Sequence, residues 1–231
     1  MLAVHDLAMR YGGEGNPGAL FEHLFFDLAP SGRLGVLGRN GQGKSTLIKI
    51  LGGVLAPTAG RVDWAMTPSW PLGFGGGFQG GLTGLDNIRF ISRIYGQPLD
   101  RVTAATEEFA QLGKALRMEV RHYSSGMRAR LAFGLSLAIE FDCYLIDEVI
   151  AVGDAAFQAK CQHELFSRRA DRAFIIASHD LEFIRATCDR AIIVDSGRAK
   201  MFEDVNLAID IYCRLSDPDA PAGYPPLRPV A

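Results

Sequence analysis

The stretch Gly38-Arg39-Asn40-Gly41-Gln42-Gly43-Lys44-Ser45-Thr46 decides how this chain is interpreted. It fits the pattern G-x-x-x-x-G-K-[ST] in full. Glycines in such a loop let successive backbone N–H groups surround a phosphate without Cβ clashes. We expect Lys44 to bring a cation to the β- and γ-phosphates of ATP, and Ser45 to place its hydroxyl on Mg²⁺. The predicted nucleotide-contacting residues of the loop are Gly38, Asn40, Gly41, Gly43, Lys44, Ser45 and Thr46.

The segments on either side of the loop favour this interpretation. The apolar run Arg33–Leu37 predicts a short buried strand, and the spacing of apolar residues over 47–51 predicts a helix that begins near Lys44. Such a helix directs the positive end of its dipole at the same phosphates. The alternative is a glycine-rich turn with a chance lysine. It is disfavoured because the loop lies between a strand and a helix.

Further along the chain, strand-like and helix-like segments are interleaved. With the phosphate loop directly after a strand, this order predicts a parallel α/β core. A mostly helical middle, about 85–140, would interrupt the core as an inserted subdomain. Expected strands are Leu2–Met9 (as an edge strand), Arg33–Leu37, Phe141–Ile146, Ala173–Ala177 and Ala191–Val194, the last continuing through Ser196-Gly197 into a hairpin with Arg198–Phe202. Expected helices are Leu85–Tyr95, Arg101–Leu112, Gly126–Ile139 and Val205–Leu215.

Composition and charge narrow the classes of function. The 231 residues suit one large domain or two closely joined subdomains, and a hydrophobic fraction of 48% supports a sizeable core. A formal net charge of −2 provides no general positive field, so we expect no nucleic-acid partner. The apolar stretch Leu131–Ile139 is much shorter than the roughly 20 residues that cross a bilayer. Any membrane role would therefore come through partners.

The four cysteines, Cys143, Cys161, Cys188 and Cys213, lie far apart and form no CxxC pair. This spacing is not that of a metal site, and a disulfide framework is not expected in a chain of this length. We expect separate free thiols in a reducing cytosol.

Two acidic residues, Asp147 and Glu148, end the apolar run 141–146. Carboxylates at the C-terminal end of a buried strand stand where α/β sheets bind ligands. We expect Asp147 to hold Mg²⁺ and Glu148 to polarise the attacking water as general base. Acidic residues after a strand are also common at helix N-termini. Their occurrence together with the phosphate loop favours the catalytic role.

The stretch Tyr123-Ser124-Ser125-Gly126-Met127 precedes the predicted helix 126–139, with Ser124 or Ser125 as its N-cap. A serine and a glycine at a helix N-terminus form a second anion-binding nest, suited to a γ-phosphate. Together with the motifs above, this stretch resembles the signature motif of the ABC-type ATPases, with Tyr, Ser and Met in place of the commonest Leu, Gly and Gln. The resemblance implies that Ser124, Ser125 and Gly126 contact ATP.

The same resemblance assigns four more positions. Gln79 stands where the family has its Q-loop glutamine, which contacts the nucleotide and Mg²⁺, and His179 follows a strand as the family's catalytic switch histidine does. Asp154 matches the D-loop aspartate, although the preceding Ala-Val-Gly is atypical. Tyr11 stands where an aromatic residue stacks on adenine. Taken singly, Gln79, His179 and Tyr11 would be an ordinary loop glutamine, a structural histidine and a packing tyrosine.

A narrower resemblance covers nearly the whole chain up to about residue 215. The glycine-rich segment 69–84, with Asp86-Asn87-Ile88-Arg89-Phe90-Ile91 and the stretch 147–154, is similar to the ATPase subunits of bacterial capsular polysaccharide exporters. The resemblance implies a homodimer that pairs with an integral-membrane permease on the cytoplasmic face of the inner membrane and hydrolyses ATP to export polysaccharide. Relatives in O-antigen or teichoic acid export are the alternative. Some of those carry a further C-terminal sugar-binding domain. Because the Pro-rich tail is short, we expect no such domain here, which favours the capsule branch.

The resemblance also implies the fold class and domain organisation. We expect a P-loop NTPase of the ABC type in residues 1–215, with a RecA-like core, a small antiparallel β subdomain and the helical insert at about 85–140. Residues 216–231 carry five prolines and are expected to form a mobile tail. In this architecture two copies face each other, and each ATP touches Lys44, Ser45 and Asp147 of one copy and Ser124–Gly126 of the other.

Two rival functions, and the GTPases as a further class, would show other sequence features. A soluble ABC ATPase of translation or chromosome handling usually carries paired domains or long coiled coils, which this sequence lacks. A regulatory protein that binds ATP without hydrolysis is disfavoured by the presence of Lys44, Asp147, Glu148 and His179. A GTPase would need an Asn-Lys-x-Asp stretch, and none occurs.

Overall fold

A computed structural model describes residues 1–11, 18–72, 78–148 and 155–216. Within it the chain divides into two compact units. The first consists of Met1–Pro71, Asp142–Glu148 and Asp171–Ala231, and the second of Leu72–Phe141 and Val149–Ala170. The second unit is thus wider than the expected insert at 85–140, because it also takes in the helical segment that follows the acidic strand.

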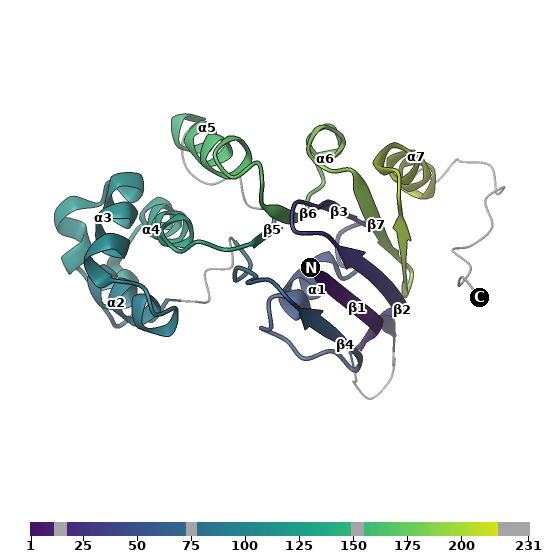
Figure 1. Cartoon of the computed structure of the whole chain (residues 1–231), viewed down its shortest axis with the longest axis horizontal. Helices are drawn as coiled ribbons and strands as arrows, with labels where there is room; N and C mark the ends of the chain where they lie inside the picture. The colour runs from purple at the N-terminus through teal and green to yellow at the C-terminus, as the bar shows by residue number, and fades with distance from the viewer. Residues whose placement is uncertain (12–17, 73–77, 149–154, 217–231) are drawn as a thin grey trace. The chain divides into compact units, whose positions relative to one another are not determined.

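The first unit is built on a sheet that positions the phosphate loop. Among the described residues this sheet has the strand order β5-β6-β3-β7-β8 (Figure 1). The first four strands run parallel, and β8 pairs antiparallel with β7. The phosphate loop follows the central strand β3. The strands are β3 (Arg33–Leu37), β5 (Cys143–Asp147), β6 (Ala173–Ala177), β7 (Arg190–Asp195) and β8 (Arg198–Phe202).

Helices alternate with the strands of this sheet along the chain, which confirms the predicted α/β core. Strand β3 leads into α1 (Lys44–Leu51), β6 leads into α6 (Leu181–Thr187), and α7 (Val205–Ser216) follows the β7–β8 hairpin. The hairpin turns at Ser196 and Gly197, whose φ angles of 50° and 81° lie in the left-handed region that tight hairpin turns require. The predicted hairpin is therefore confirmed.

A second, antiparallel sheet in this unit has the order β2-β1-β4. Its strands are β1 (Leu2–Arg10), β2 (Ala19–Leu28) and β4 (Ala59–Trp64). The prediction that Leu2–Met9 is an edge strand is wrong, because β1 pairs with β2 on one side and β4 on the other. Strand β4 was not foreseen. Most of its residues are exposed, and its apolar alternation is limited to the partly buried Val62 and Trp64.

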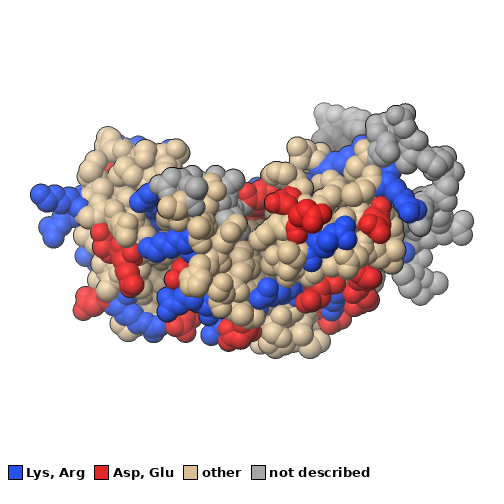
Figure 2. All heavy atoms as spheres, turned by 90° about the horizontal axis from the view of Figure 1, so that it is seen from above, with Lys and Arg blue, Asp and Glu red and all other residues tan. Residues whose placement is uncertain are grey.

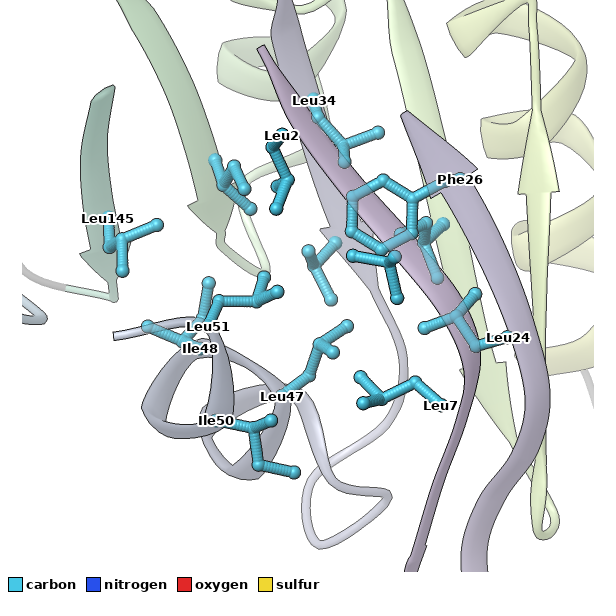
Figure 3. Close-up of a cluster of buried hydrophobic side chains, with 14 of the residues drawn as sticks. Leu2, Leu7, Leu24, Phe26, Leu34, Leu47, Ile48, Ile50, Leu51 and Leu145 are labelled. Carbon is cyan, nitrogen blue, oxygen red and sulfur yellow. The ribbon is translucent and has the colours of Figure 1, made fainter. Parts of the chain in front are cut away.

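The core of the first unit lies between these elements. Figure 3 shows side chains of α1 pointing toward side chains of β1, β2, β3 and β5. Leu47 and Ile48 of α1 are fully buried, as are Leu2 and Leu34 of the two sheets. Burial of such side chains stabilises the fold by about 1.5–3 kcal/mol each. This packing holds the first turn of α1, and with it Lys44 and Ser45, in a fixed place at the end of β3.

The second unit is helical in its described parts. It contains α2 (Gly84–Ile94), α3 (Leu99–Ala110), α4 (Ser125–Ala138) and α5 (Ala155–Gln162), with short helices at Gly113–Arg117, Val120–His122 and His163–Ser167. The rings of Phe109, Phe133 and Phe157 pack together and join α3, α4 and α5. Lys160 of α5 donates hydrogen bonds to the carbonyl groups of Glu108 and Phe109 at the end of α3.

The distribution of surface charge and the length of the helices bear on whether the chain could contact nucleic acid or a membrane. Lysine and arginine side chains are interspersed with aspartate and glutamate on the face shown in Figure 2. Across the stretches that the structure describes, every helix is too short or too polar to cross a membrane.

Candidate nucleotide-binding and hydrolysis site

The phosphate loop joins β3 to α1, as its sequence predicts. Gly43 is the N-cap residue of α1, and Lys44 and Ser45 form the first turn. Gly41 has a φ of 82°, and a Cβ built there would meet no heavy atom of the described residues within 4 Å. The loop therefore offers an open, glycine-lined approach at its tip, which fits the close approach of a phosphate to backbone N–H groups.

Lys44 is nearly buried, with an exposed fraction of 6%. Its Nζ donates hydrogen bonds to the carbonyl oxygens of Gly38 (2.6 Å) and Arg39 (3.5 Å). The same Nζ lies 3.7 Å from Oε1 of Glu148. A buried ammonium needs such partners, and phosphate oxygens are acceptors of the same kind. The lysine is thus held inside the loop that it is predicted to serve.

The loop is also attached to the β7–β8 turn, a contact that no local sequence pattern predicts. The backbone N–H of Ser196 donates to Oε1 of Gln42 at 2.9 Å, and Arg39 lies 3.7 Å from Asp195. A Cβ at Gly38 would meet the carbonyl oxygen of Val194 at 2.5 Å. Because β3 and β7 are neighbours, the hairpin turn fixes the shape of the loop.

Ser45 and Asp147 place two oxygen atoms side by side. Ser45 Oγ donates a hydrogen bond of 2.9 Å to Oδ1 of Asp147, at the end of β5. Partial burial raises the pKa of Asp147, and the hydrogen bond from Ser45 opposes this rise. Hard oxygen ligands next to a phosphate loop are the donor set that Mg²⁺ prefers.

This pair fits Mg²⁺ only together with a nucleotide. Among the described residues there is no group of three or more His, Cys, Asp and Glu side chains that could hold a metal ion unaided. Mg²⁺ in nucleotide sites commonly relies on one or two protein ligands, substrate phosphates and water. Ser45 and Asp147 would hold the ion in this way, beside the β- and γ-phosphates at Lys44.

Glu148 follows Asp147 in a conformation uncommon for glutamate. Its φ is 54°, in the left-handed region, while its N–H donates to the carbonyl of Ala177 at 3.0 Å. Backbone strain of this kind is concentrated at functional sites. Oε1 of Glu148 lies 3.8 Å from Nδ1 of His179, which follows β6 and has 79% of its side chain exposed. The neighbouring strands β5 and β6 bring the glutamate and the histidine together.

Tyr11 also lies near the phosphate loop. Its side-chain hydroxyl is 3.4 Å from Oγ1 of Thr46, and 54% of the residue is exposed. Thus six residues predicted for the site, from four separate stretches of the sequence, are brought together in the first unit: Tyr11, Lys44, Ser45, Asp147, Glu148 and His179.

The other predicted residues of the phosphate loop and the start of α1 lie in the same unit: Gly38, Asn40, Gly41, Gly43 and Thr46. The predicted residues that come later in the sequence, apart from Asp147, Glu148 and His179, lie outside this group. Gln79 and Ser124 belong to the second unit. Ser124 is the N-cap of α4, and its Oγ accepts a hydrogen bond from the N–H of Met127 at 3.2 Å, so Ser125 and Gly126 form the first turn. Gln79 is exposed, while its backbone is bound by the side chain of Asn87. Asp154 lies outside the described residues.

A phosphate-binding loop after the central strand of a parallel sheet, with two carboxylates at the end of a nearby strand, defines a P-loop nucleoside-triphosphate-binding domain. Comparison with known families narrows this class. The family model described as ABC transporter matches residues 21–151, and the chain belongs to this family.

Several characterised relatives are similar over almost the whole chain. The capsule polysaccharide export ATP-binding protein CtrD of Neisseria meningitidis is 49% identical over 93% of this chain and 100% of its own length. The ATP-binding protein BexA of Haemophilus influenzae is 48% identical over 92% of this chain and 98% of its own. The O-antigen export system ATP-binding protein RfbB of Klebsiella pneumoniae is 35% identical over 83% of this chain and 79% of its own. The resemblance to capsular polysaccharide exporter ATPases is confirmed.

Solved structures support the fold. One, described as the ATP-binding subunit of an ABC transporter, superposes with a TM-score of 0.75 at 20% identity, covering 91% of this chain and 93% of the other. Another is the dimeric, post-hydrolysis state of the ATP-binding cassette MJ0796 bound to ADP and Pi, with a TM-score of 0.74 at 16% identity over 88% and 98% of the two chains. The predicted fold class is confirmed.

Proposed function

We propose that this chain is the ATP-binding and ATP-hydrolysing subunit of an inner-membrane exporter of capsular polysaccharide. The observation that carries the proposal is the 49% and 48% identity to CtrD and BexA, over at least 98% of each relative. The polysialic acid transport protein KpsT of Escherichia coli follows at 41%. The O-antigen relative RfbB is both less similar and matched over a smaller share of its length. Export of O-antigen is therefore the alternative outcome of the test.

The site residues divide the work of hydrolysis. Backbone N–H groups of the phosphate loop and Nζ of Lys44 bind the β- and γ-phosphates and offset their charge. Ser45 and Asp147 hold Mg²⁺, which when bound supplies positive charge to the phosphate oxygens. Because the chemistry of phosphoryl transfer depends mainly on position and charge, this rigid arrangement supplies most of the catalysis.

Glu148 and His179 act on the attacking water. The carboxylate of Glu148 orients the water and accepts its proton, and it is supported by the ammonium of Lys44 at 3.7 Å. His179, 3.8 Å from the same carboxylate, contacts the γ-phosphate and the water. Tyr11 stacks on the adenine ring beside Thr46.

The partners follow from the same proposal. One chain contains two separate anion-binding helix ends, the phosphate loop before α1 and the Ser124-capped start of α4. Two chains in a head-to-tail dimer would let each ATP contact both kinds of helix end. We place the dimer on the cytoplasmic face of the inner membrane, where it drives a permease that handles the polysaccharide.

A genetic and a biochemical measurement test the function together. The purified chain should release phosphate from ATP in the presence of Mg²⁺. In a strain from which the gene has been deleted, the wild-type chain should restore polysaccharide at the cell surface, and Glu148→Gln should leave it inside. Restored O-antigen with unchanged capsule would reject the capsular assignment, and absence of ATPase activity would reject the whole proposal.

A further inference from the structure

One buried side chain, that of Asn87 on α2, binds both backbone polar groups of Gln79, whose carbonyl oxygen also accepts from the N–H of Leu82 at 3.0 Å. Asn87 has an exposed fraction of 1%. Its Oδ1 accepts a hydrogen bond from the N–H of Gln79 at 2.9 Å, and its Nδ2 donates to the carbonyl oxygen of Gln79 at 3.2 Å. The same Nδ2 donates to the carbonyl oxygen of Thr83 at 2.9 Å. Both backbone polar groups of Gln79 are therefore bound by one residue.

An asparagine is well suited to this position. The planar side-chain amide offers an acceptor and two donors, and here all three functions are used. Aspartate would keep the acceptor but set its second oxygen against two carbonyl oxygens. Leucine would fill a similar volume and remove these three bonds. The carbonyl oxygens of Gln79 and Thr83 would keep the N–H groups of Leu82 and of residue 87 as donors, whereas the N–H of Gln79 would lose its acceptor. The identity of the residue at 87 therefore decides how firmly Gln79 is held.

The hydrogen bonds continue from Gln79 toward the start of α4. The carbonyl oxygens of Gly80 and Leu82 accept from the N–H groups of Arg121 (2.8 Å) and Val120 (2.9 Å). The N–H of Gly84 donates to the carbonyl oxygen of Met118 at 3.2 Å. This short backbone ladder connects the segment that follows Gln79 to the segment that precedes Ser124. Gln79 is thus fixed at its backbone, while the residue itself remains exposed.

We propose that Asn87 is a positioning residue for hydrolysis, which fixes the backbone of Gln79, the residue whose exposed side chain is proposed to contact Mg²⁺. The inference rests on the proposed function through the role of Gln79. Substitution of Asn87 frees the N–H of Gln79 without touching Lys44, Ser45 or Asp147, which belong to the other unit. It therefore slows hydrolysis and raises the requirement for Mg²⁺, while ATP binding to the phosphate loop persists.

The first measurement is hydrogen exchange at the Gln79 amide in the full-length protein, resolved to single residues. In Asn87→Leu this amide should exchange roughly tenfold faster than in the wild type, because its hydrogen bond is lost. Asn87→Asp retains the acceptor and should give a smaller increase. Ser92→Ala is the matched control. Ser92 is equally buried on α2, its hydroxyl donates to the carbonyl of Ile88, and its loss should leave the Gln79 amide unchanged. Unchanged exchange in Asn87→Leu would overturn the inference.

The second measurement separates positioning from stability. In Asn87→Leu the half-saturating Mg²⁺ concentration for ATPase activity should rise roughly tenfold and kcat should fall, as expected for loss of an outer-shell partner. Gln79→Ala should behave similarly, and combining the two changes should add nothing further. An equal effect in Ser92→Ala, or fully additive effects, would reject the role of Asn87. If the wild type itself lacks ATPase activity, the proposed function fails, and the exchange data alone decide whether Asn87 holds Gln79.

Discussion

Ser45 and Asp147 are separated by 102 positions in the chain, yet the hydroxyl of one donates a 2.9 Å hydrogen bond to the carboxylate of the other. Ser45 lies in the first turn of the helix after β3, and Asp147 ends β5. Strand β6 separates β3 from β5, so the contact spans two strand spacings at the carboxyl edge of the sheet. This pair is the expected Mg²⁺ site. Because the carboxyl group of Asp147 is partly buried, we expect Mg²⁺ binding to depend on pH.

Affinity for Mg²⁺–ATP should fall as the pH is lowered. Burial raises the pKa of Asp147, so this carboxyl group takes up a proton at a higher pH than a free aspartate does. Only the deprotonated form binds the cation, so protons compete with Mg²⁺ as the pH drops through the raised pKa. Titration of a fluorescent ATP analogue with Mg²⁺ at a series of pH values measures the effect. Asp147→Asn should bind Mg²⁺ weakly and lose this pH dependence; a variant that keeps the dependence would assign it to another group.

Replacing Glu148 by glutamine should abolish turnover and leave ATP binding intact. The change keeps the size of the side chain but removes the proton acceptor, so steady-state phosphate release should fall by about 10²- to 10⁴-fold. Glu182→Gln is the control, because that glutamate is 88% exposed and pairs with Arg185 on α6. Normal ATPase activity in Glu148→Gln would remove Glu148 from the role of base.

Gly38→Ala should disturb the phosphate loop, whereas Gly18→Ala should not. A Cβ at Gly38 would meet the carbonyl oxygen of Val194 at 2.5 Å, a backbone atom that yields only if β7 shifts. At Gly18 a Cβ meets nothing within 4 Å among the described residues. We expect Gly38→Ala to lower the free energy of unfolding by about 1–3 kcal/mol, as overpacking does, and to weaken ATP binding. Denaturant unfolding and nucleotide titration of both variants check this; equal behaviour of the two would contradict it.

Two substitutions at Ser124 should separate its structural role from its catalytic role. Ser124→Ala removes the N-cap of α4 and should cost about 1 kcal/mol of stability. Ser124→Asp restores a capping side chain, and with it the stability, but introduces a negative charge where the γ-phosphate of ATP is expected. Both variants should lose ATPase activity. If Ser124→Asp recovers activity as well as stability, Ser124 serves the helix alone.

Thiol reactivity should be confined to Cys213 in the folded protein. Cys143, Cys161 and Cys188 are buried, and burial raises the pKa of each to about 12, which suppresses the reactive thiolate. Cys213 on α7 is exposed. A colorimetric thiol reagent should therefore react quickly with one equivalent, and with the rest only after unfolding. Cys213→Ser should lose the fast phase; a fast phase that persists would show that a buried thiol becomes accessible in the native state.

Local sequence was enough to predict the elements whose signals are short-range. The phosphate loop between β3 and α1 follows from its glycines and lysine, and the β7–β8 hairpin follows from Ser196-Gly197. Strand β4 was not predicted in this way, because its alternation is short: only Val62 and Trp64 are partly buried, and the other residues of the strand are exposed. It exists through its pairing with β1, and this pairing places β1 in the middle of its sheet.

The sequence by itself was enough to predict which residues carry chemistry, because a phosphate loop needs glycine and lysine, and a magnesium site needs carboxylate and hydroxyl oxygens. Tertiary structure decided which of these residues meet. The order β5-β6-β3 brings Glu148 within 3.8 Å of His179 and 3.7 Å of Lys44, and no local pattern encodes the order of strands. The role of Asn87 could likewise be inferred only from the tertiary structure. Its burial and its hydrogen bonds to the backbone of Gln79 depend on how residues 79–87 fold back on themselves.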